Sequence, residues 1–281
     1  MKVSVKRRIL FNSSHRSNRT GWFMLNFLLN KVSLGITGFE SAAATYSQLP
    51  LTLQELLIDA PSSTSISIME DGSLTKMGVY AGDLLIVNQS LTPQTGDVVL
   101  CDLNGDIICR ILDIERRSLF KIELVPDQII ETKILETDDF TIMGVVPSSI
   151  RVHVENDNRF RDFTLNGLTV ADAQFNLDEL LNINPQATFF AQASGNSMQG
   201  SGIFNNDLII VDRALEVTNE AVIVCNYNGE FACKIINTIN QTLLSTSCEH
   251  GPKPIRKIDT FNVEGVVPVS IRILRPIPKL I

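Results

Sequence analysis

The sequence predicts a mainly β protein made of two tandem copies of one domain behind a short basic N-terminal arm. Three observations predict this: an internal repeat at a spacing of 124 residues, short β-branched runs in each copy, and an Asn-Gly pair at the same place in each. The length of 281 residues also fits two domains, since one domain commonly spans about 100–200 residues.

The repeat defines the two copies. When residue n is set against residue n+124, residues 51–112 share 19 identities in 62 positions without a gap. The run from Asp83 to Val87, for example, falls on the run from Asp207 to Val211. Such self-similarity over a domain length indicates duplication of one structural unit. We expect an arm, a first copy and a second copy at residues 1–37, 38–155 and 156–281.

Near the ends of the copies the repeat continues at a different spacing. Gly144-Val145-Val146-Pro147 matches Gly265-Val266-Val267-Pro268 at an offset of 121, so copy 2 lacks three residues between the two matching regions. Both copies are therefore expected to end in the same segment.

Each copy has the pattern of a curved β domain with little helix. Runs such as Leu84 to Val87 are short and rich in β-branched residues, which is typical of strands. An Asn-Gly pair, Asn104-Gly105 or Asn228-Gly229, separates two apolar runs and predicts a hairpin, because a type I′ turn needs positive φ at both central positions. Short helices are expected over Leu53–Ile58 and Leu177–Leu181.

Charge is unevenly distributed. The net charge is −7, from 24 basic and 31 acidic residues, which excludes a uniformly basic nucleic-acid-binding protein. Residues 1–36 nevertheless hold seven basic residues and no acidic one, so the remainder carries 17 basic against 31 acidic residues, or −14. Clustered positive charge attracts phosphates, so the arm is expected either to touch DNA or an acidic protein surface, or to be a solvated tail.

Three further readings concern the arm and the membrane. No run reaches the roughly 18 apolar residues of a membrane span, so we expect no membrane association. A secretory signal is disfavoured because Asn26, Asn30 and Lys31 break the apolar stretch. Met24 is an alternative start of the protein, which would make residues 1–23 an upstream extension.

The cysteines and histidines do not form a metal site. The chain has five cysteines but no Cys-x-x-Cys pair, and its three histidines do not cluster near them. An odd cysteine count in a chain of this size favours reduced, buried thiols in the cytoplasm over a disulfide framework. We expect no metal and no cofactor.

Copy 2 carries a candidate nucleophile and base. Ser197 lies in a glycine-flanked loop from Gly195 to Gly202, and Lys234 lies on the second strand of the predicted hairpin. Alternation along that strand puts Lys234 on one face with Ala232 and Ile236, where desolvation lowers the pKa of a lysine. A neutral lysine can take a proton from a serine hydroxyl. The competing interpretations are an ordinary turn serine and a lysine whose ammonium reaches water.

Copy 1 has the same spacing without the same chemistry. The residues aligned with Ser197 and Lys234 are Ser73 and Arg110, again 37 residues apart. An arginine does not give up its proton in proteins, so Arg110 cannot serve as a base. Copy 1 is therefore a degenerate equivalent of the site in copy 2.

The blocks around these residues resemble the LexA/UmuD-type self-cleaving peptidases. Ala193 to Met198, followed by Asp207 to Asp212, resembles their catalytic-serine block. Gly229 to Lys234 resembles their lysine block, and Gly265-Val266-Val267 resembles their closing strand. The resemblance covers nearly all of residues 157–281 and, in degenerate form, about 38–150.

The resemblance implies a fold, a mechanism and a partner. The fold is the β-clip-like C-terminal domain of LexA and UmuD, present twice. Ser197 is implied as the nucleophile and Lys234 as the general base, with the backbone N–H groups of Asn196 and Ser197 as oxyanion donors. The reaction is cleavage of a bond in the protein's own N-terminal arm, stimulated by the RecA–single-stranded-DNA filament after DNA damage.

Within the family the chain resembles UmuD most, because only a short arm precedes the first copy. Gly38 to Tyr46 is similar to the segment just after UmuD's cleaved bond, which makes Thr37–Gly38 the expected cleavage bond. UmuD works as a dimer and as the accessory subunit of an error-prone translesion polymerase, so an UmuC-like partner and a role in the SOS response are implied. Thr37 departs from the usual Ala or Cys, and copy 2 has Arg161-Asp162 at the matching place.

These differences leave several hypotheses open. One is a fused pseudo-dimer in which Ser197 and Lys234 cleave the arm of copy 1; further self-association of the fused chain is also open. Another is a non-cleaving UmuD-like module that binds a polymerase or RecA. A hydrolase using Ser197 with His250 is disfavoured because the loop is not Gly-x-Ser-x-Gly, and a signal-peptidase relative because no anchor precedes the domain.

Overall fold

The protein is described by a computed structural model that covers residues 24–27, 52–124, 127–154, 176–181, 183–184, 186–247 and 251–276. It divides into two compact units: unit 1 comprises residues 1–51 and 184–268, and unit 2 comprises residues 52–183 and 269–281. Each unit is mainly antiparallel β sheet, as the sequence predicts.

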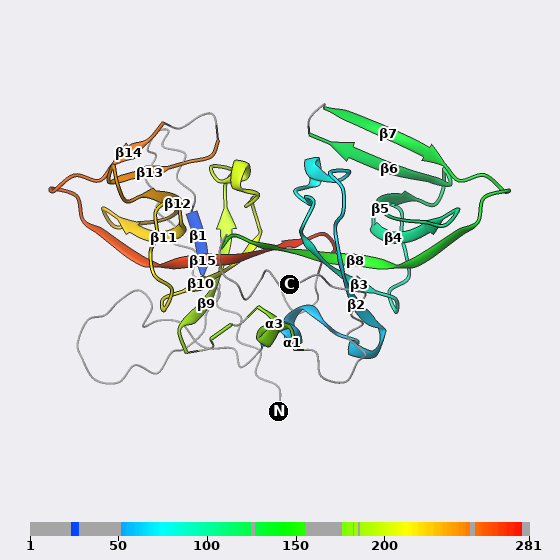
Figure 1. Cartoon of the computed structure of the whole chain (residues 1–281), viewed down its shortest axis with the longest axis horizontal. Coiled ribbons are helices and arrows are strands. Elements are labelled where there is room, and N and C mark those ends of the chain that lie inside the picture. Colours follow the sequence, from blue (N-terminus) through cyan, green and yellow to red (C-terminus); the bar gives the residue numbers. More distant parts are fainter. Residues whose placement is uncertain are drawn as a thin grey trace. The chain divides into compact units, whose positions relative to one another are not determined.

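Unit 2 holds the described part of copy 1 together with two segments of copy 2 (Figure 1). Most of its strands follow one another along the chain and pair antiparallel with their neighbours, in the order β8-β4-β5-β6-β7, while β2 pairs with β3 and β3 with β8. Its elements are α1 (Leu53–Leu57), η2 (Pro61–Ser63), β2 (Thr64–Ile68), η3 (Thr75–Met77), β3 (Leu84–Asn88), β4 (Val98–Leu103), β5 (Asp106–Asp113), β6 (Ser118–Glu123), β7 (Gln128–Lys133), β8 (Phe140–Val152), α3 (Leu177–Leu180) and the end of β15 (Phe261–Ile273).

Strand β8 curves the sheet of copy 1. It pairs with β4 up to Val145 and with β3 from Val145 onward, and the register shifts in both pairings. Gly144 lies at this crossing, where an added Cβ would stand 2.7 Å from the side chain of Val87. Its counterpart Gly265 would bring a Cβ within 2.8 Å of the carbonyl oxygen of Asp212. The glycine of the repeated Gly-Val-Val-Pro segment has no side chain, so the neighbouring backbone can pack closely against it. This lets one long strand pair with two different strands.

Both Asn-Gly hairpins form as predicted. Asn104 and Gly105 have φ of 56° and 90° between β4 and β5, and Asn228 and Gly229 have φ of 53° and 87° between the matching strands of copy 2. Two positive φ values in the loop are what a type I′ turn requires. The turn fixes which residues oppose one another, and so fixes the face on which the basic residue of each hairpin lies.

Two segments of copy 2 complete unit 2 through self-complementary pairings. Strand β15 lies antiparallel to β8 with Ile271 opposite Ile150, its own counterpart in the repeat. Helices α1 and α3 lie side by side (Figure 1). Asp178 accepts from the N–H groups of Leu53 and Gln54 at 2.8 and 3.0 Å, and the side chain of Gln54 accepts from Leu177 N–H at 2.8 Å. Each repeat thus satisfies the free N–H groups at the other's helix start.

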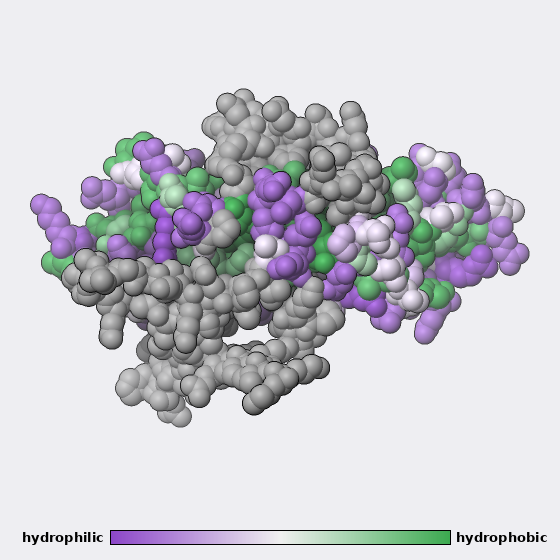
Figure 2. Space-filling view, turned by 90° about the horizontal axis from the view of Figure 1, so that it is seen from below, coloured by the Kyte–Doolittle hydropathy of each residue, from purple (hydrophilic) through white to green (hydrophobic). Residues whose placement is uncertain are grey.

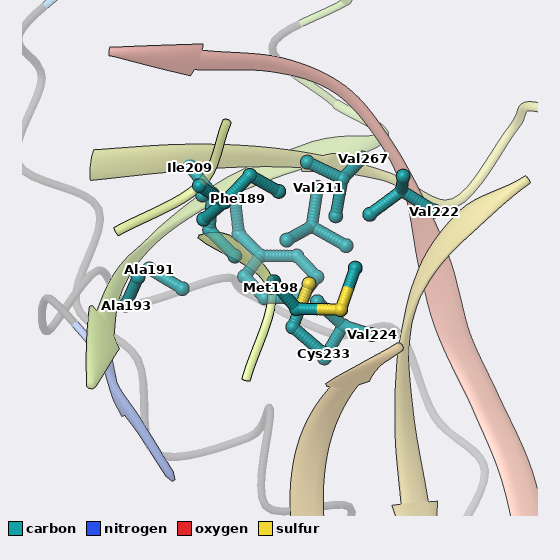
Figure 3. Packing of buried hydrophobic residues seen from close by; sticks show 11 residues of the cluster. Phe189, Ala191, Ala193, Met198, Ile209, Val211, Val222, Val224, Cys233 and Val267 are labelled. Atoms are coloured by element: carbon teal, nitrogen blue, oxygen red, sulfur yellow. The ribbon is translucent and has the colours of Figure 1, made fainter. Parts of the chain in front are cut away.

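Unit 1 repeats the same architecture in the rest of copy 2 and adds one strand from the arm. Its core centres on Met198, Val224 and Cys233, which point into one apolar cluster (Figure 3). Its elements are β1 (Met24–Phe27), β9 (Thr188–Ser194), η4 (Gln199–Ser201), β10 (Leu208–Asp212), β11 (Val222–Tyr227), β12 (Glu230–Asn237), β13 (Thr242–Leu244), β14 (Lys253–Pro254) and the first part of β15.

The described surface is mixed in polarity, and four cysteines lie in the interior. On the face drawn in Figure 2, hydrophilic residues are interspersed with smaller apolar patches over the described surface. Among the described residues, none of the helices has the length and apolar character needed to cross a membrane. Cys101, Cys109, Cys225 and Cys233 are buried and free.

Candidate active site

Ser197 is held by the turn that follows β9. The chain leaves the strand through Gly195, whose φ of +93° favours glycine, and enters the 3-10 turn η4 two residues after the serine. The side chain of Met198 next to it is fully buried and anchors the loop in the core of unit 1. Ser197 itself is 5% exposed, so its hydroxyl sits at a desolvated position rather than on an ordinary surface turn.

Lys234 comes from the middle of β12, directly opposite Ile223 of β11. It is 4% exposed, and its same-face neighbours Ala232 and Ile236 are buried in one apolar cluster while Cys233 belongs to another. The predicted strand alternation is therefore present, and the lysine does not extend to water. Burial, the largest cause, lowers the pKa of Lys234 below its ordinary value of 10.5.

The two side chains are in contact. Lys234 Nζ donates to Ser197 Oγ at 2.8 Å in a buried hydrogen bond. A lysine that loses its proton accepts one from this hydroxyl along the same line, which is the geometry a general base needs. The neighbouring thiol does not compete as nucleophile, because burial raises the pKa of Cys233 to about 12.

Copy 1 also brings the matching residues together, but there the basic residue is an arginine in an ion pair. Arg110, on β5, donates from one terminal nitrogen to Ser73 Oγ at 2.6 Å and to the carbonyl oxygen of Cys109 at 2.7 Å. Its other terminal nitrogen lies 3.2 Å from Asp71 Oδ2 in an ion pair. Ser73 is completely buried. Ser73 thus accepts a hydrogen bond from a permanently charged guanidinium, and Arg110 cannot act as a base toward it.

Asp71 is a site residue that the repeat alone did not single out. It also accepts from Ser73 N–H at 2.9 Å. Burial favours its neutral form, but the hydrogen bonds from Ser73 and the charge of Arg110 outweigh that effect and lower the pKa of Asp71. The aligned residue of copy 2 is Gly195. A carboxylate beside a basic group favours the protonated form, so copy 2 lacks at this position the charge that would hold Lys234 protonated.

A second unanticipated residue fixes the serine loop from the far side. The backbone N–H groups of Thr246 and Ser247 donate to the carbonyl oxygen of Ser197 at 2.8 and 3.1 Å, and Thr246 Oγ1 accepts from Ser201 N–H at 3.1 Å. In copy 1, Ile122 N–H makes the matching bond to the carbonyl of Ser73 at 2.7 Å. Thr246 belongs to no motif in the sequence, so only the structure reveals its contact with the serine loop.

The other predicted residues have different outcomes. Asn196 is exposed beside Ser197, and its carbonyl accepts from Gln199 N–H at 3.2 Å. Thr37, Gly38, Arg161, Asp162 and His250 lie outside the described residues. His153 hydrogen-bonds Ser270 Oγ at 2.8 Å. Within the described part of the chain, His, Cys, Asp and Glu side chains form no group of three or more that would hold a metal ion.

Comparison with known proteins identifies the family of the chain. The Peptidase S24-like family matches residues 27–147 and again residues 162–268. The chain belongs to this family, the LexA/UmuD type, and contains its domain twice. It is 32% identical to the protein ImpA of Salmonella typhimurium over 109 residues, which cover 39% of this chain and 73% of ImpA.

Two further relatives match shorter stretches of the chain. The protein SamA of Salmonella typhimurium is 31% identical over 80 residues, or 28% of this chain and 57% of SamA. The protein MucA of Escherichia coli is 34% identical over 61 residues, or 22% of this chain and 42% of MucA.

Proposed function

We propose that this chain is an UmuD-like protein of the SOS response and a serine peptidase that uses Ser197 and Lys234 to cleave its own N-terminal arm near Thr37–Gly38. The single observation that carries the proposal is the buried 2.8 Å contact between Lys234 Nζ and Ser197 Oγ. The Peptidase S24-like family supplies the reaction class, because its members resemble self-cleaving serine peptidases.

The steps follow from the two side chains. Neutral Lys234 takes the proton of Ser197 Oγ, which attacks the carbonyl carbon of the scissile bond and forms a tetrahedral intermediate. Protonated Lys234 then gives the proton to the leaving amine as the C–N bond breaks, leaving an ester on Ser197 that water hydrolyses. The backbone N–H groups of Asn196 and Ser197 are the proposed donors to the oxyanion; such donors typically lower the barrier by about 3 kcal/mol.

Tethering favours cleavage within one chain. The proposed domains are the arm at residues 1–37, copy 1 at 38–155 and copy 2 at 156–281. Copy 1 would be preceded by the bond Thr37–Gly38, which only copy 2 could cut, because Arg110 replaces the base in copy 1. A linked segment reaches an effective concentration of about millimolar, which favours the intramolecular reaction.

The proposed partners follow from the family role. Stimulation by a RecA–single-stranded-DNA filament would trigger cleavage after DNA damage, and the product would serve an UmuC-like error-prone translesion polymerase in the cytoplasm. A non-cleaving pseudo-dimer that binds the polymerase or RecA is the second candidate, favoured by Thr37 and by the ion-paired Arg110.

Mass spectrometry of purified full-length protein tests the proposal and separates the two candidates. Incubation at alkaline pH, with and without activated RecA filament, is expected to produce a new N-terminus at Gly38. The Ser197→Ala variant is the matched control and should stay intact. An unchanged full-length mass in the wild type, together with a Ser197 that resists a serine-directed acylating probe, would favour the non-cleaving module.

A further inference from the structure

The outer edge of β9 is occupied by a strand of the arm. β1 pairs antiparallel with β9, with Met24 opposite Ser194 and Phe27 opposite Ala191. β1 also contacts β12, the strand that carries Lys234. Figure 3 shows β1, in blue, beside Ala191 and Ala193. Since β9 ends three residues before Ser197, the arm strand is paired with the strand that leads to the serine and contacts the strand that carries the lysine.

Copy 1 offers a comparison for this edge. Its matching strand, β2, pairs with β3 alone among the residues that the structure describes. β9 also extends two residues beyond the counterpart of the end of β2, and β1 pairs with that extension at Ala193 and Ser194. The added strand is therefore found on the copy that has a lysine beside its serine.

The direction of β1 determines what this pairing can do. Phe27 lies opposite a residue six positions before Ser197, or about 20 Å along the strand at roughly 3.3 Å per residue. The chain leaves β1 in the direction away from the serine. Thr37 follows Phe27 by ten residues, which span at most ~33 Å, so the chain is long enough to turn and bring Thr37–Gly38 back to the dyad.

We propose that the edge of β9 is an exosite, which holds residues 24–27 of the arm as an added strand and thereby presents the downstream bond Thr37–Gly38 to Ser197. This inference rests on the proposed peptidase function. Strand addition binds through main-chain hydrogen bonds and so tolerates an unusual sequence near the bond. Binding energy from a segment remote from the reacting atoms compensates for a poorly fitting residue such as Thr37.

Proline substitution tests the exosite in the full chain. A Leu25→Pro/Asn26→Pro variant removes two consecutive backbone donors from β1, and so disrupts the ladder whichever of the two is bonded. We expect cleavage at Gly38 to slow by at least about tenfold as the local concentration of the arm falls. Labelling of Ser197 by the acylating probe should be unchanged. Ser13→Pro/Ser14→Pro is the matched control outside the paired residues and should cleave normally.

A cysteine lock tests the same pairing with the opposite perturbation. Asn26 and Gln192 oppose each other, so Asn26→Cys/Gln192→Cys should form a disulfide on oxidation, whereas Asn26→Cys alone should not. The locked chain should cleave at least as fast as its reduced form.

The outcomes separate the two proposals. A wild-type Ser197 that the probe does not label would overturn the peptidase function itself. If the probe labels Ser197, the exosite is overturned by normal or faster cleavage in the proline variant, by an uncleaved locked chain, or by an arm that stays intact in every form.

Discussion

Copy 1 and copy 2 hold a serine against a basic side chain at the same place in the repeat, but only in copy 1 is that basic side chain ion-paired with a carboxylate in this contact. In copy 1 the Arg110 guanidinium is neutralised by Asp71, and Ser73 completes that ion pair. In copy 2 a buried lysine contacts Ser197, and glycine stands where the carboxylate would be. The two copies therefore differ at two positions, the basic residue and the charge beside it, and we expect the reactivity of each serine to depend on both.

The largest expected effect comes from giving copy 2 the cation of copy 1. Lys234→Arg keeps a donor to Ser197 but removes a group that can accept a proton. General-base catalysis contributes about 10²–10⁴-fold, so we expect acylation of Ser197 to fall by roughly 10³-fold. The rate of labelling by the serine-directed probe measures this. Arg110→Ala changes the matching residue of copy 1 and is the control, so labelling of Ser197 should be unchanged. An equal loss of labelling in that control would show that the loss in Lys234→Arg comes from a change in folding.

The next effect comes from giving copy 2 the carboxylate of copy 1. In the wild type, burial lowers the pKa of Lys234, so labelling should rise with pH and level off below pH 10.5. Gly195→Asp places a negative charge near Lys234, which favours the ammonium and moves the midpoint of the pH profile upward by about 1–2 units. At a pH below both midpoints this corresponds to a loss of about 10–100-fold.

The control for that substitution is Gly195→Asn. Any side chain is strained at the φ of +93°, and asparagine introduces that strain without the charge. A midpoint that moves equally in both variants would show that backbone strain, and not the missing carboxylate, distinguishes the two copies.

Lysine burial also ties this site to stability. Because the folded-state pKa of Lys234 is depressed, the unfolded chain binds the extra proton below the unfolded pKa of about 10.5. The stability contributed by the neutral lysine therefore increases as pH rises toward that value and is lost as pH falls through the folded pKa.

A smaller effect is expected from building the dyad in copy 1. Arg110→Lys alone should leave Ser73 unreactive, because Asp71 would hold the new ammonium protonated. Adding Asp71→Gly removes that charge, and labelling of Ser73 should then exceed the single variant by about tenfold, as one unit of pKa shift implies at a fixed pH. Peptide mapping after labelling in a Ser197→Ala background measures it. Equal labelling with and without Asp71 would contradict the two-position account.

Much of the fold and the site could be predicted because the deciding interactions are local or repeated. Asn104-Gly105 and Asn228-Gly229 fix their own turns through φ, and the hairpin register then places Lys234 among buried neighbours. The match of two blocks 37 residues apart predicts the contact of Ser197 with Lys234.

The parts that could not be predicted depend on contacts between distant residues. Asp71 is 39 residues from Arg110, and its role appears only when the loop folds onto β5. The apolar run Met24–Phe27 resembles a broken signal segment in sequence, and nothing local shows that it pairs with β9. Copy 2 contributes segments to unit 2 through pairings between residues more than a hundred positions apart, such as Ile150 with Ile271, and no local pattern predicts such pairings.

The smallest expected effect concerns how each copy fixes its serine loop. Thr246 bonds the loop of copy 2 through both its backbone N–H and its hydroxyl, whereas Ile122 of copy 1 has only the backbone bond. Thr246→Val removes the hydroxyl, and a lost hydrogen bond of about 1 kcal/mol lowers the labelling rate of Ser197 about fivefold. Thr246→Ser restores the acceptor and should restore the rate. Thr246 positions the loop through its hydrogen bonds to Ser197 and Ser201, so the midpoint of the pH profile should be the same in all three proteins. A shifted midpoint would mean that the loop also affects the pKa of Lys234.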